Sequence, residues 1–412
     1  MKTKLTVLSF LVISAMLLSA CAPQTAPVAP VVPVEKPAEK PVAQEPTAVQ
    51  AAPTTAPAEK PAVSEEIDFA KMGIDCAKYS DTYSKGPNGE VTTAASKIKL
   101  TDEDIAKVKQ GNYTAALLWA GAGEWYNGLT SGAKAEFEKL GIKIVATGDA
   151  QFDPAKQATD VETALALKPN IILTLVVDPV SGAQAFQPAV DKNVVLVFAD
   201  NGADKYEAGK QYVGIVTGDH YGMGRGSADL MAEAIGGKGK IGFIYHDADY
   251  FVTNNRDRSF ICQIKSKYPD IKVVAAGGFT EEPKTEEVAS AMLTQHSDLN
   301  GIYVAWDVAA EGVIAALRGA NRTDIKVITE DLGANNDLDM AQGGNMYGKT
   351  IDMPYSIGVT MADQAALKLL GKETYPFVVV DLMKVKKDNL ADAWKKALNL
   401  DPPENIMKAL EK

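Results

Sequence analysis

Residues 113–149 read YTAALLWAGAGEWYNGLTSGAKAEFEKLGIKIVATGD: an apolar run, an amphipathic segment and a second apolar run. Residues 115–120 and 143–147 are predicted strands, and residues 128–140 are a predicted helix. Near-continuous runs of Val, Ile, Leu and Ala indicate strands that are buried on both faces, as in a parallel sheet. This stretch therefore predicts a βαβ unit and an α/β fold class.

The same alternation continues through the rest of the chain. Before residue 218, it predicts further strands at 171–177 and 194–199, with helices at 154–167 and 183–190. After residue 218 it predicts strands at 240–245, 273–276, 301–305 and 326–329, with helices at 225–235, 255–267, 286–295 and 312–318. So many strands exceed what a compact open sheet usually holds. We therefore predict two doubly wound parallel-sheet lobes, a single large sheet being the alternative.

The N-terminus has the pattern of an export signal. Lys2 and Lys4 precede an apolar segment, Leu5–Leu18, that is too short for a stable membrane span. The tetrad Leu18-Ser19-Ala20-Cys21 resembles a bacterial lipobox, which predicts a signal peptide over residues 1–20 and a lipid anchor on Cys21. The protein is then expected on the extracytoplasmic or periplasmic side of the cell membrane. The alternative is an ordinary secretory signal that is cut near Ala20 or Ala22.

Two segments separate the signal from the first βαβ unit. Residues 21–64 are rich in Pro and Ala and contain no aromatic residue, which predicts a disordered tether. Residues 65–110 form an N-terminal extension with short helices expected at 68–76 and 101–109 and with no function that the sequence reveals. Cys76 lies in this extension. Export permits a disulfide with Cys262, but the spacing does not imply one, and Cys262 also fits a small buried core position.

Composition and motifs exclude several functions. The formal net charge is −11 and no stripe of Lys and Arg is present, which argues against a nucleic-acid partner. With 3 His and 3 Cys, the chain has little from which to build a metal site or a nucleophilic mechanism. Gly222-Met223-Gly224-Arg225-Gly226 lacks the spacing of a dinucleotide-binding loop, and Gly236–Lys240 leads into a strand, unlike a phosphate-binding loop. We therefore expect no cofactor, no metal and no enzymatic activity.

Polar and aromatic residues gather directly after the predicted strands, where open parallel sheets bind ligands. The candidate contacts are Trp125, Tyr126, Asp200, Asn201, Asn254, Arg256, Trp306, Asp307 and Asp331. Aromatic faces can cover the C–H faces of a sugar, and charged groups make strong hydrogen bonds to hydroxyls. Any single acid of this set could instead cap a helix, but Trp and Tyr gain nothing from capping. The set as a whole predicts a binding cleft.

At these residues the chain resembles periplasmic binding proteins of the ribose- and galactose-binding type, which have the type I fold, over about residues 113–386. The aromatic pair Trp125-Tyr126, the polar pair Asp200-Asn201 and Arg256 four residues before Phe260 fit that family. The resemblance adds Asp352, which stands two residues before a proline, as a ligand contact. It also implies three crossovers between the lobes, near Gly218-Asp219, Asp352-Met353 and Asp381-Leu382. Lobe 1 then comprises residues 111–218 and 353–381, and lobe 2 comprises residues 219–352 followed by residues 382–412, which include the C-terminal tail.

The resemblance implies a monomeric solute-binding lipoprotein that captures a sugar or polyol and delivers it to the membrane permease of an ABC importer. Some positions depart from the family pattern. Trp306 replaces a common Asn, Asn201 stands where ribose binders have Arg, and Thr280 stands where an aromatic residue is usual. These departures leave the identity of the ligand open. The alternatives are a lipoprotein or sensor of the same fold that binds nucleosides or signalling furanosides, and a glycoside hydrolase that uses two of Asp200, Asp307, Asp331 and Asp352.

Overall fold

Lobe 1 is built on a seven-stranded sheet in which all neighbouring strands run parallel. The computed structural model describes residues 67–412, so the predicted signal peptide, tether and Cys21 lie outside the described residues. In spatial order the strands are β1 (Thr93–Ala94), β12 (Phe377–Val380), β6 (Ile215–Gly218), β5 (Val195–Ala199), β4 (Ile171–Thr174), β2 (Thr114–Trp119) and β3 (Lys143–Asp149). Its helices are α1 (Asp102–Gln110), α2 (Glu124–Leu140), α3 (Pro154–Ala166), α4 (Pro179–Asp191) and α10 (Pro354–Leu369). All residues of β2 except Thr114 are buried, as expected for a strand covered on both faces.

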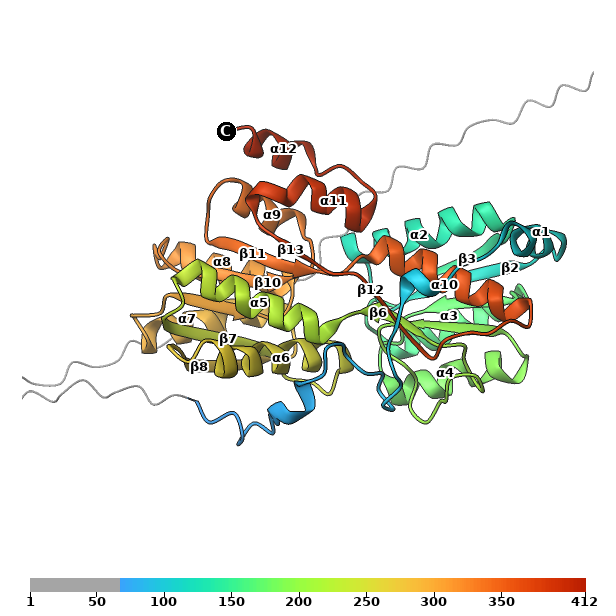
Figure 1. Ribbon diagram of the computed structural model, residues 1–412, viewed down its shortest axis with the longest axis horizontal. Coiled ribbons are helices and arrows are strands. Elements are labelled where there is room, and N and C mark those ends of the chain that lie inside the picture. The colour runs from blue at the N-terminus through green and yellow to red at the C-terminus, as the bar shows by residue number, and fades with distance from the viewer. Residues whose placement is uncertain (1–66) are drawn as a thin grey trace, which may run out of the picture. The chain divides into compact units, whose positions relative to one another are not determined.

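Lobe 2 is built on a six-stranded sheet that is parallel except for its edge strand β13, which pairs antiparallel with β11. In spatial order the strands are β13 (Met383–Val385), β11 (Met346–Ile351), β10 (Lys326–Glu330), β9 (Gly301–Val304), β7 (Gly239–His246) and β8 (Ile271–Phe279). The helices of this half are α5 (His220–Ile235), α6 (Phe251–Lys267), α7 (Thr285–Gln295), α8 (Asp307–Gly319) and α9 (Ala334–Ala341). The predicted architecture of two parallel-sheet α/β lobes is confirmed (Figure 1).

The chain passes between the two sheets after β6, after β11 and after β12. Two C-terminal helices follow, α11 (Leu390–Leu398) and α12 (Glu404–Leu410). Helix α11 contacts α2 and α10 of lobe 1, while Trp394 on the same helix donates a hydrogen bond of 2.8 Å to Asp337 of lobe 2. Asp337 also forms a fully buried ion pair of 2.6 Å with Lys349. Residues 382–412, predicted as part of lobe 2, therefore contact both lobes.

Residues 67–97, which we name the strap, begin on lobe 2. Phe69 is buried in the core of lobe 2, where its ring meets Phe243 edge to face at 5.9 Å. Cys76 opens a short 3₁₀ helix, η1 (Cys76–Tyr79), and forms a disulfide with Cys262 of α6. The sequence had left this disulfide open. The helix predicted at 68–76 was wrong, because residues 69–73 form turns and regular structure begins at Cys76.

The strap then runs past the first crossover to lobe 1. The backbone N–H of Ser84 donates to Asp219 Oδ1 (2.9 Å), and Arg225 donates to the carbonyl of Asp81 (3.0 Å). β1 then pairs with β12 at the edge of the lobe 1 sheet. Figure 1 shows this early segment in blue. The N-terminal extension is therefore a fourth link between the lobes, in addition to the three crossovers.

Glycines allow the closest helix contacts. A Cβ on Gly224 would lie 2.2 Å from the carbonyl oxygen of Arg256, so only glycine lets α5 approach α6 at this point. A Cβ on Gly226 would lie 2.5 Å from Thr350 of β11. The glycine-rich sequence at 222–226 is thus a helix-packing surface inside α5 and not a phosphate loop. This packing fixes α6 at the residue that lies at the centre of the candidate site.

None of the helices in residues 67–412 combines the length and the apolar character that crossing a membrane requires.

Candidate ligand-binding cleft

Arg256 lies at the centre of a buried cluster of carboxylates. It projects from α6 with a side chain that is 3% exposed. Its Nη1 lies 2.6 Å from Asp331 Oδ2, its Nη2 lies 3.5 Å from Asp352 Oδ2, and its Nε lies 3.2 Å from Glu330 Oε2. These acids follow or end adjacent strands, so the parallel sheet delivers them to one place. The predicted residues Arg256, Asp331 and Asp352 are therefore brought together.

Lobe 1 reaches this cluster through the start of α2. Trp125 donates from Nε1 to Asp352 Oδ1 at 3.0 Å, and Tyr126 meets the Trp125 ring edge to face at 5.2 Å. Burial raises the pKa of the Tyr126 hydroxyl well above its usual value, and the nearby Tyr250 and Asp200 raise it further. The aromatic pair predicted from the sequence therefore lies against the acidic cluster.

Asp200 and Asn201 follow β5 of lobe 1, and both side chains are buried. Asp200 Oδ1 accepts a hydrogen bond of 2.5 Å from Thr217 Oγ1 on the adjacent strand β6. The amide of Asn201 interacts with the Tyr250 hydroxyl, yet neither amide atom makes a hydrogen bond of good geometry. Asp331 Oδ1 is likewise without a hydrogen-bond partner. Buried polar atoms that lack a hydrogen-bond partner are suited to bind the polar groups of a ligand.

A second aromatic wall belongs to lobe 2. Trp306 lies 4.7 Å from Phe279 and 5.0 Å from His246 between ring centroids. Its Nε1 donates to Glu282 Oε1 at 2.7 Å, which fixes the plane of the indole. Glu282 also acts electrostatically on Tyr126 of lobe 1. The indole N–H of Trp306 is therefore directed to Glu282 and not to the carboxylates around Arg256.

The two remaining predicted contacts have different surroundings. Burial raises the pKa of Asp307 well above its usual value, Lys349 opposes that shift and Asp331 adds to it. Asp307 opens α8 and interacts electrostatically with Asp331 of the cluster. Asn254 is half-buried on α6, and within residues 67–412 its side chain makes no hydrogen bond to the cluster.

Several residues of the network were absent from the predicted set. Glu330 pairs with Arg256 at 3.2 Å, and Tyr303 donates to Asp257 Oδ1 at 2.9 Å. Thr217 was missed because β6 was not recognised as a strand, so the residues at its carboxyl end were not considered. Glu330 could have been chosen, since it directly precedes Asp331 at the end of a predicted strand.

Burial dominates the electrostatics of the cluster. It raises the pKa of Asp352 and of Glu330 well above their usual values, and it raises the pKa of Asp200 to about 6. The Arg256 guanidinium opposes each of these shifts. One cation shared by several carboxyl groups favours a neutral ligand whose hydroxyls donate to carboxylates and accept from arginine. In residues 67–412, no group of His, Cys, Asp or Glu is arranged to hold a metal ion.

Comparison with known proteins agrees with this geometry. Residues 115–373 match the periplasmic binding protein domain family, which is more than half of the chain. The chain belongs to this family. The type I fold and the resemblance deduced from the sequence are thereby confirmed.

Individual relatives of this binding protein have sugars or polyols in their names. The chain is 24% identical to the ribose import binding protein of Escherichia coli over 63% of this chain and 85% of that protein. It is 26% identical to the xylitol-binding protein of Mycolicibacterium smegmatis over 58% of this chain and 68% of that protein. A solute-binding protein of an ABC transporter from Mycobacterium smegmatis, solved with bound glycerol, superposes with a TM-score of 0.61 at 25% identity, covering 71% of this chain and 100% of that chain.

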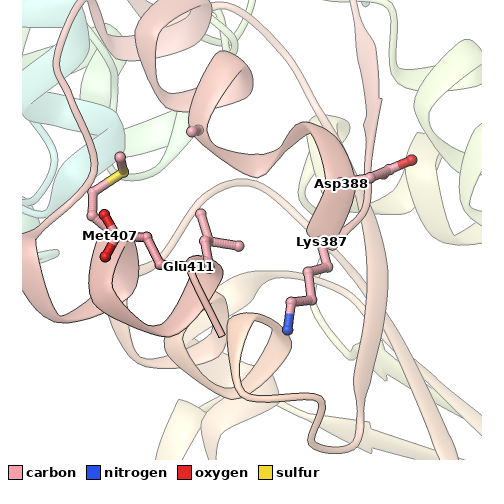
Figure 2. Close-up of a pocket in the computed structure, with 6 residues that line it drawn as sticks. Lys387, Asp388, Met407 and Glu411 are labelled. Carbon is pink, nitrogen blue, oxygen red and sulfur yellow. The ribbon is translucent and has the colours of Figure 1, made fainter.

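A separate hollow of about 580 Å³ lies at the C-terminus between the 3₁₀ helix η4 (Lys387–Asn389), α11 and α12. Figure 2 shows Lys387, Asp388, Met407 and Glu411 around it. It contains none of the predicted contacts, and we do not assign it to ligand binding.

Proposed function

We propose that this protein captures a small polyhydroxylated ligand, a sugar or polyol, between its two lobes and delivers it to the membrane permease of an ABC importer. It binds the ligand without chemical turnover. The observation that most directly supports this proposal is that Trp125 of lobe 1 and Arg256 of lobe 2 both bind one carboxylate, Asp352. A ligand that contacts both lobes shifts the balance between open and closed arrangements, because only differential contact can do so.

The ligand-binding residues in this proposal are the polar residues at or near Arg256 and the aromatic residues of the two lobes. They are Trp125, Tyr126, Asp200, Asn201, Asn254, Arg256, Trp306, Asp307, Asp331 and Asp352. Family membership supports the proposal, and so do relatives named for ribose and xylitol. The unpartnered atoms of Asn201 and Asp331 supply acceptors and donors for ligand hydroxyls.

A thermal-shift screen tests the proposal directly. The panel contains D-ribose, D-allose, D-arabinose, xylitol, glycerol, adenosine and several L-amino acids. A ligand that binds only the folded protein raises the unfolding midpoint. We expect at least one sugar or polyol to do so, and calorimetry on that compound then gives the affinity. A panel in which no sugar or polyol raises the midpoint contradicts the proposal.

A nucleoside is the second candidate, because Trp306 and Phe279 form an aromatic surface on which a base could stack. A shift with adenosine and with no sugar or polyol would favour it. The enzymatic alternative is tested by incubating the purified protein with the same compounds and analysing them for products. Sustained conversion would establish an enzyme and exclude a purely binding role.

We also propose that the mature protein is a monomer, anchored by a lipid on Cys21 at the extracytoplasmic face of the cell membrane. The lipobox tetrad supports this anchor, and the family is one of periplasmic proteins. Cys21→Ser is expected to leave an unlipidated precursor with its signal peptide uncut. Metabolic labelling with a fatty acid, followed by mass determination, checks this outcome. A Cys21→Ser protein that is still processed and membrane-bound like the parent would refute the lipid anchor.

A further inference from the structure

His220 occupies a position at the first crossover that neither the predicted site nor the family match assigns. It opens α5 directly after β6, and its side chain is fully buried. Its Nδ1 lies 3.3 Å from Arg256 Nε, and its Nε2 lies 2.7 Å from Thr217 Oγ1. The Phe251 ring meets the imidazole edge to face at 6.0 Å and fixes its plane. The imidazole thus stands between a cation on lobe 2 and a hydroxyl on lobe 1.

The hydrogen bonds along this chain of contacts all run in one direction, from Arg256 through His220 and Thr217 to Asp200. Arg256 Nε–H can only donate, so His220 Nδ1 must be the acceptor and carries no proton. The neutral ring then has its proton on Nε2, which donates to Thr217 Oγ1. The Thr217 hydroxyl in turn donates to Asp200 Oδ1 at 2.5 Å. Burial lowers the pKa of His220 well below its usual value, and Arg256 lowers it further, which agrees with a neutral ring.

We infer that His220 is a positioning residue for ligand binding, whose neutral imidazole holds Arg256 of lobe 2 and Asp200 of lobe 1 in one hydrogen-bonded relay across the hinge. The inference rests on the proposed function, because it takes Asp200 and Arg256 as ligand contacts. The relay directs the Thr217 hydroxyl to Asp200 Oδ1 and leaves the second carboxylate oxygen for the ligand. It also fixes the rotation of the guanidinium, whose Nη atoms face Asp331 and Asp352.

The relay acts on a carboxylate with several charged neighbours. Arg256 opposes proton binding at Asp200, while burial and Asp331 favour it. Asp352 interacts electrostatically with Asp200 as well. The Tyr250 hydroxyl does the same from the residue before α6. Because a hydrogen bond to the charged form favours that form, the directed Thr217 hydroxyl helps to keep Asp200 ionised.

Nitrogen NMR of the ligand-free protein tests the relay without any ligand. With uniform ¹⁵N labelling, one of the three histidines should show a protonated Nε2 and an unprotonated Nδ1, and should stay neutral at pH values below the usual histidine pKa. His220→Gln identifies its signal. An Nδ1–H tautomer, or an imidazolium at neutral pH, overturns the relay whether or not a ligand is known.

Affinity measurements test the positioning role, with the panel compound that gives the largest thermal shift as the probe. His220→Ala removes the acceptor to which the Arg256 Nε–H is directed and leaves only Glu330 Oε2, 3.2 Å from Nε, so the guanidinium is held less firmly. The affinity should then be about 10- to 100-fold weaker. His220→Asn keeps an acceptor near Nδ1, and His220→Gln keeps a donor near Nε2. In the Ala and Asn variants the Thr217 hydroxyl is no longer directed at Asp200. The pH at which affinity has fallen halfway, through protonation of Asp200, should therefore move up by about half a unit. The Gln variant should restore the parental value of this pH.

The matched controls are His296→Asn and His296→Gln, at the end of α7. Both should leave the affinity and its pH dependence unchanged. A folded His220→Ala protein with parental affinity and midpoint overturns the positioning role. Failure of the whole panel to bind would instead contradict the proposed function, while the NMR result still decides the relay.

Discussion

At the scale of single residues, the backbone itself directs two of the site carboxylates. Asp200 and Asp331 each follow a strand, β5 and β10, and each has a positive φ, 54° and 64°. Such a conformation is unfavourable for a residue with a Cβ, and it persists where the surrounding structure fixes it. Here it turns the chain at the strand end, so that the carboxylates of both lobes approach Arg256.

Truncation of Trp125 is expected to separate binding from folding. Trp125→Ala removes a hydrogen bond to Asp352 and an aromatic face, so the probe ligand should bind about 30- to 1000-fold more weakly, or ~2–4 kcal/mol. Trp125→Phe removes the N–H but keeps a smaller aromatic face, and it should lose less. Calorimetry gives the affinities, and thermal unfolding without ligand should change little.

Arg256→Ala should weaken binding by a similar factor but also destabilise the fold by about 3 kcal/mol, because it leaves buried carboxylates without their cation. Arg258→Ala is the control, since it lies two residues along α6 and half-buried, and it should retain parental affinity. Equal losses in the Arg256 and Arg258 variants would show that the cleft has been misplaced.

Acidification should change stability and affinity in opposite directions. Burial raises the pKa of Asp200 to about 6 and that of Asp257 to about 7, above the values of an unfolded chain. The folded state therefore takes up protons as the pH falls through these values, and the ligand-free protein should gain unfolding free energy from about pH 8 to about pH 5.5. Protonation of Asp200 in the same pH range removes the carboxylate that accepts hydrogen bonds from ligand hydroxyls. The affinity should therefore fall about tenfold by about pH 5.

Thermal unfolding across this pH range, with and without the probe ligand, measures both effects. In Asp200→Asn the affinity should be weaker but nearly independent of pH. If the ligand-induced rise in midpoint were the same at both ends of the range in the parent protein, Asp200 would not be an ionised ligand contact.

At the scale of elements, the sequence predicted four strands of each sheet, since runs such as residues 115–120 and 171–177 are apolar on both faces. It also pointed to the carboxyl ends of strands, where Asp331 and Asp352 lie beside Arg256. It missed β11, β12 and β13 near the C-terminal end. It also missed β6, whose four residues, Ile215–Gly218, include Thr217 and a glycine, and with that strand it missed the relay to Asp200. Neither β1 nor the disulfide was predicted. A two-residue strand and a pairing over 186 residues leave no local pattern.

The strap offers a prediction at this scale. Replacing both Cys76 and Cys262 by Ser removes the covalent tie between η1 and α6 and should lower the unfolding free energy by about 2–4 kcal/mol. Limited proteolysis should then cut between residues 77 and 92 sooner than in the parent. A reducing agent should lower the midpoint of the parent and leave that of the double variant unchanged. No difference between the two proteins in either assay would mean that the strap is held without the disulfide.

At the scale of the whole molecule, four segments join the lobes: the three crossovers and the strap. If ligand closes the lobes about these segments, the radius of gyration measured by small-angle scattering should decrease when the probe ligand is added. Trp125→Ala, which lacks the contact from lobe 1, should show a smaller decrease at the same ligand concentration. An unchanged radius at saturating ligand would mean that the lobes do not move on binding.

The disulfide also sets an order of events during biosynthesis. Cys76 precedes Cys262 by 186 residues, so at typical elongation rates its thiol exists for roughly 10–40 s before its partner is made. During that interval the strands of lobe 1 other than β12 are synthesised, followed by α5, β7 with Phe243 and the first part of α6, whereas β8, β9, β10 and β11 come later. The strap therefore docks late, on a lobe that is synthesised long after it. Correct pairing depends on lobe 2 folding before another thiol or an oxidant captures Cys76.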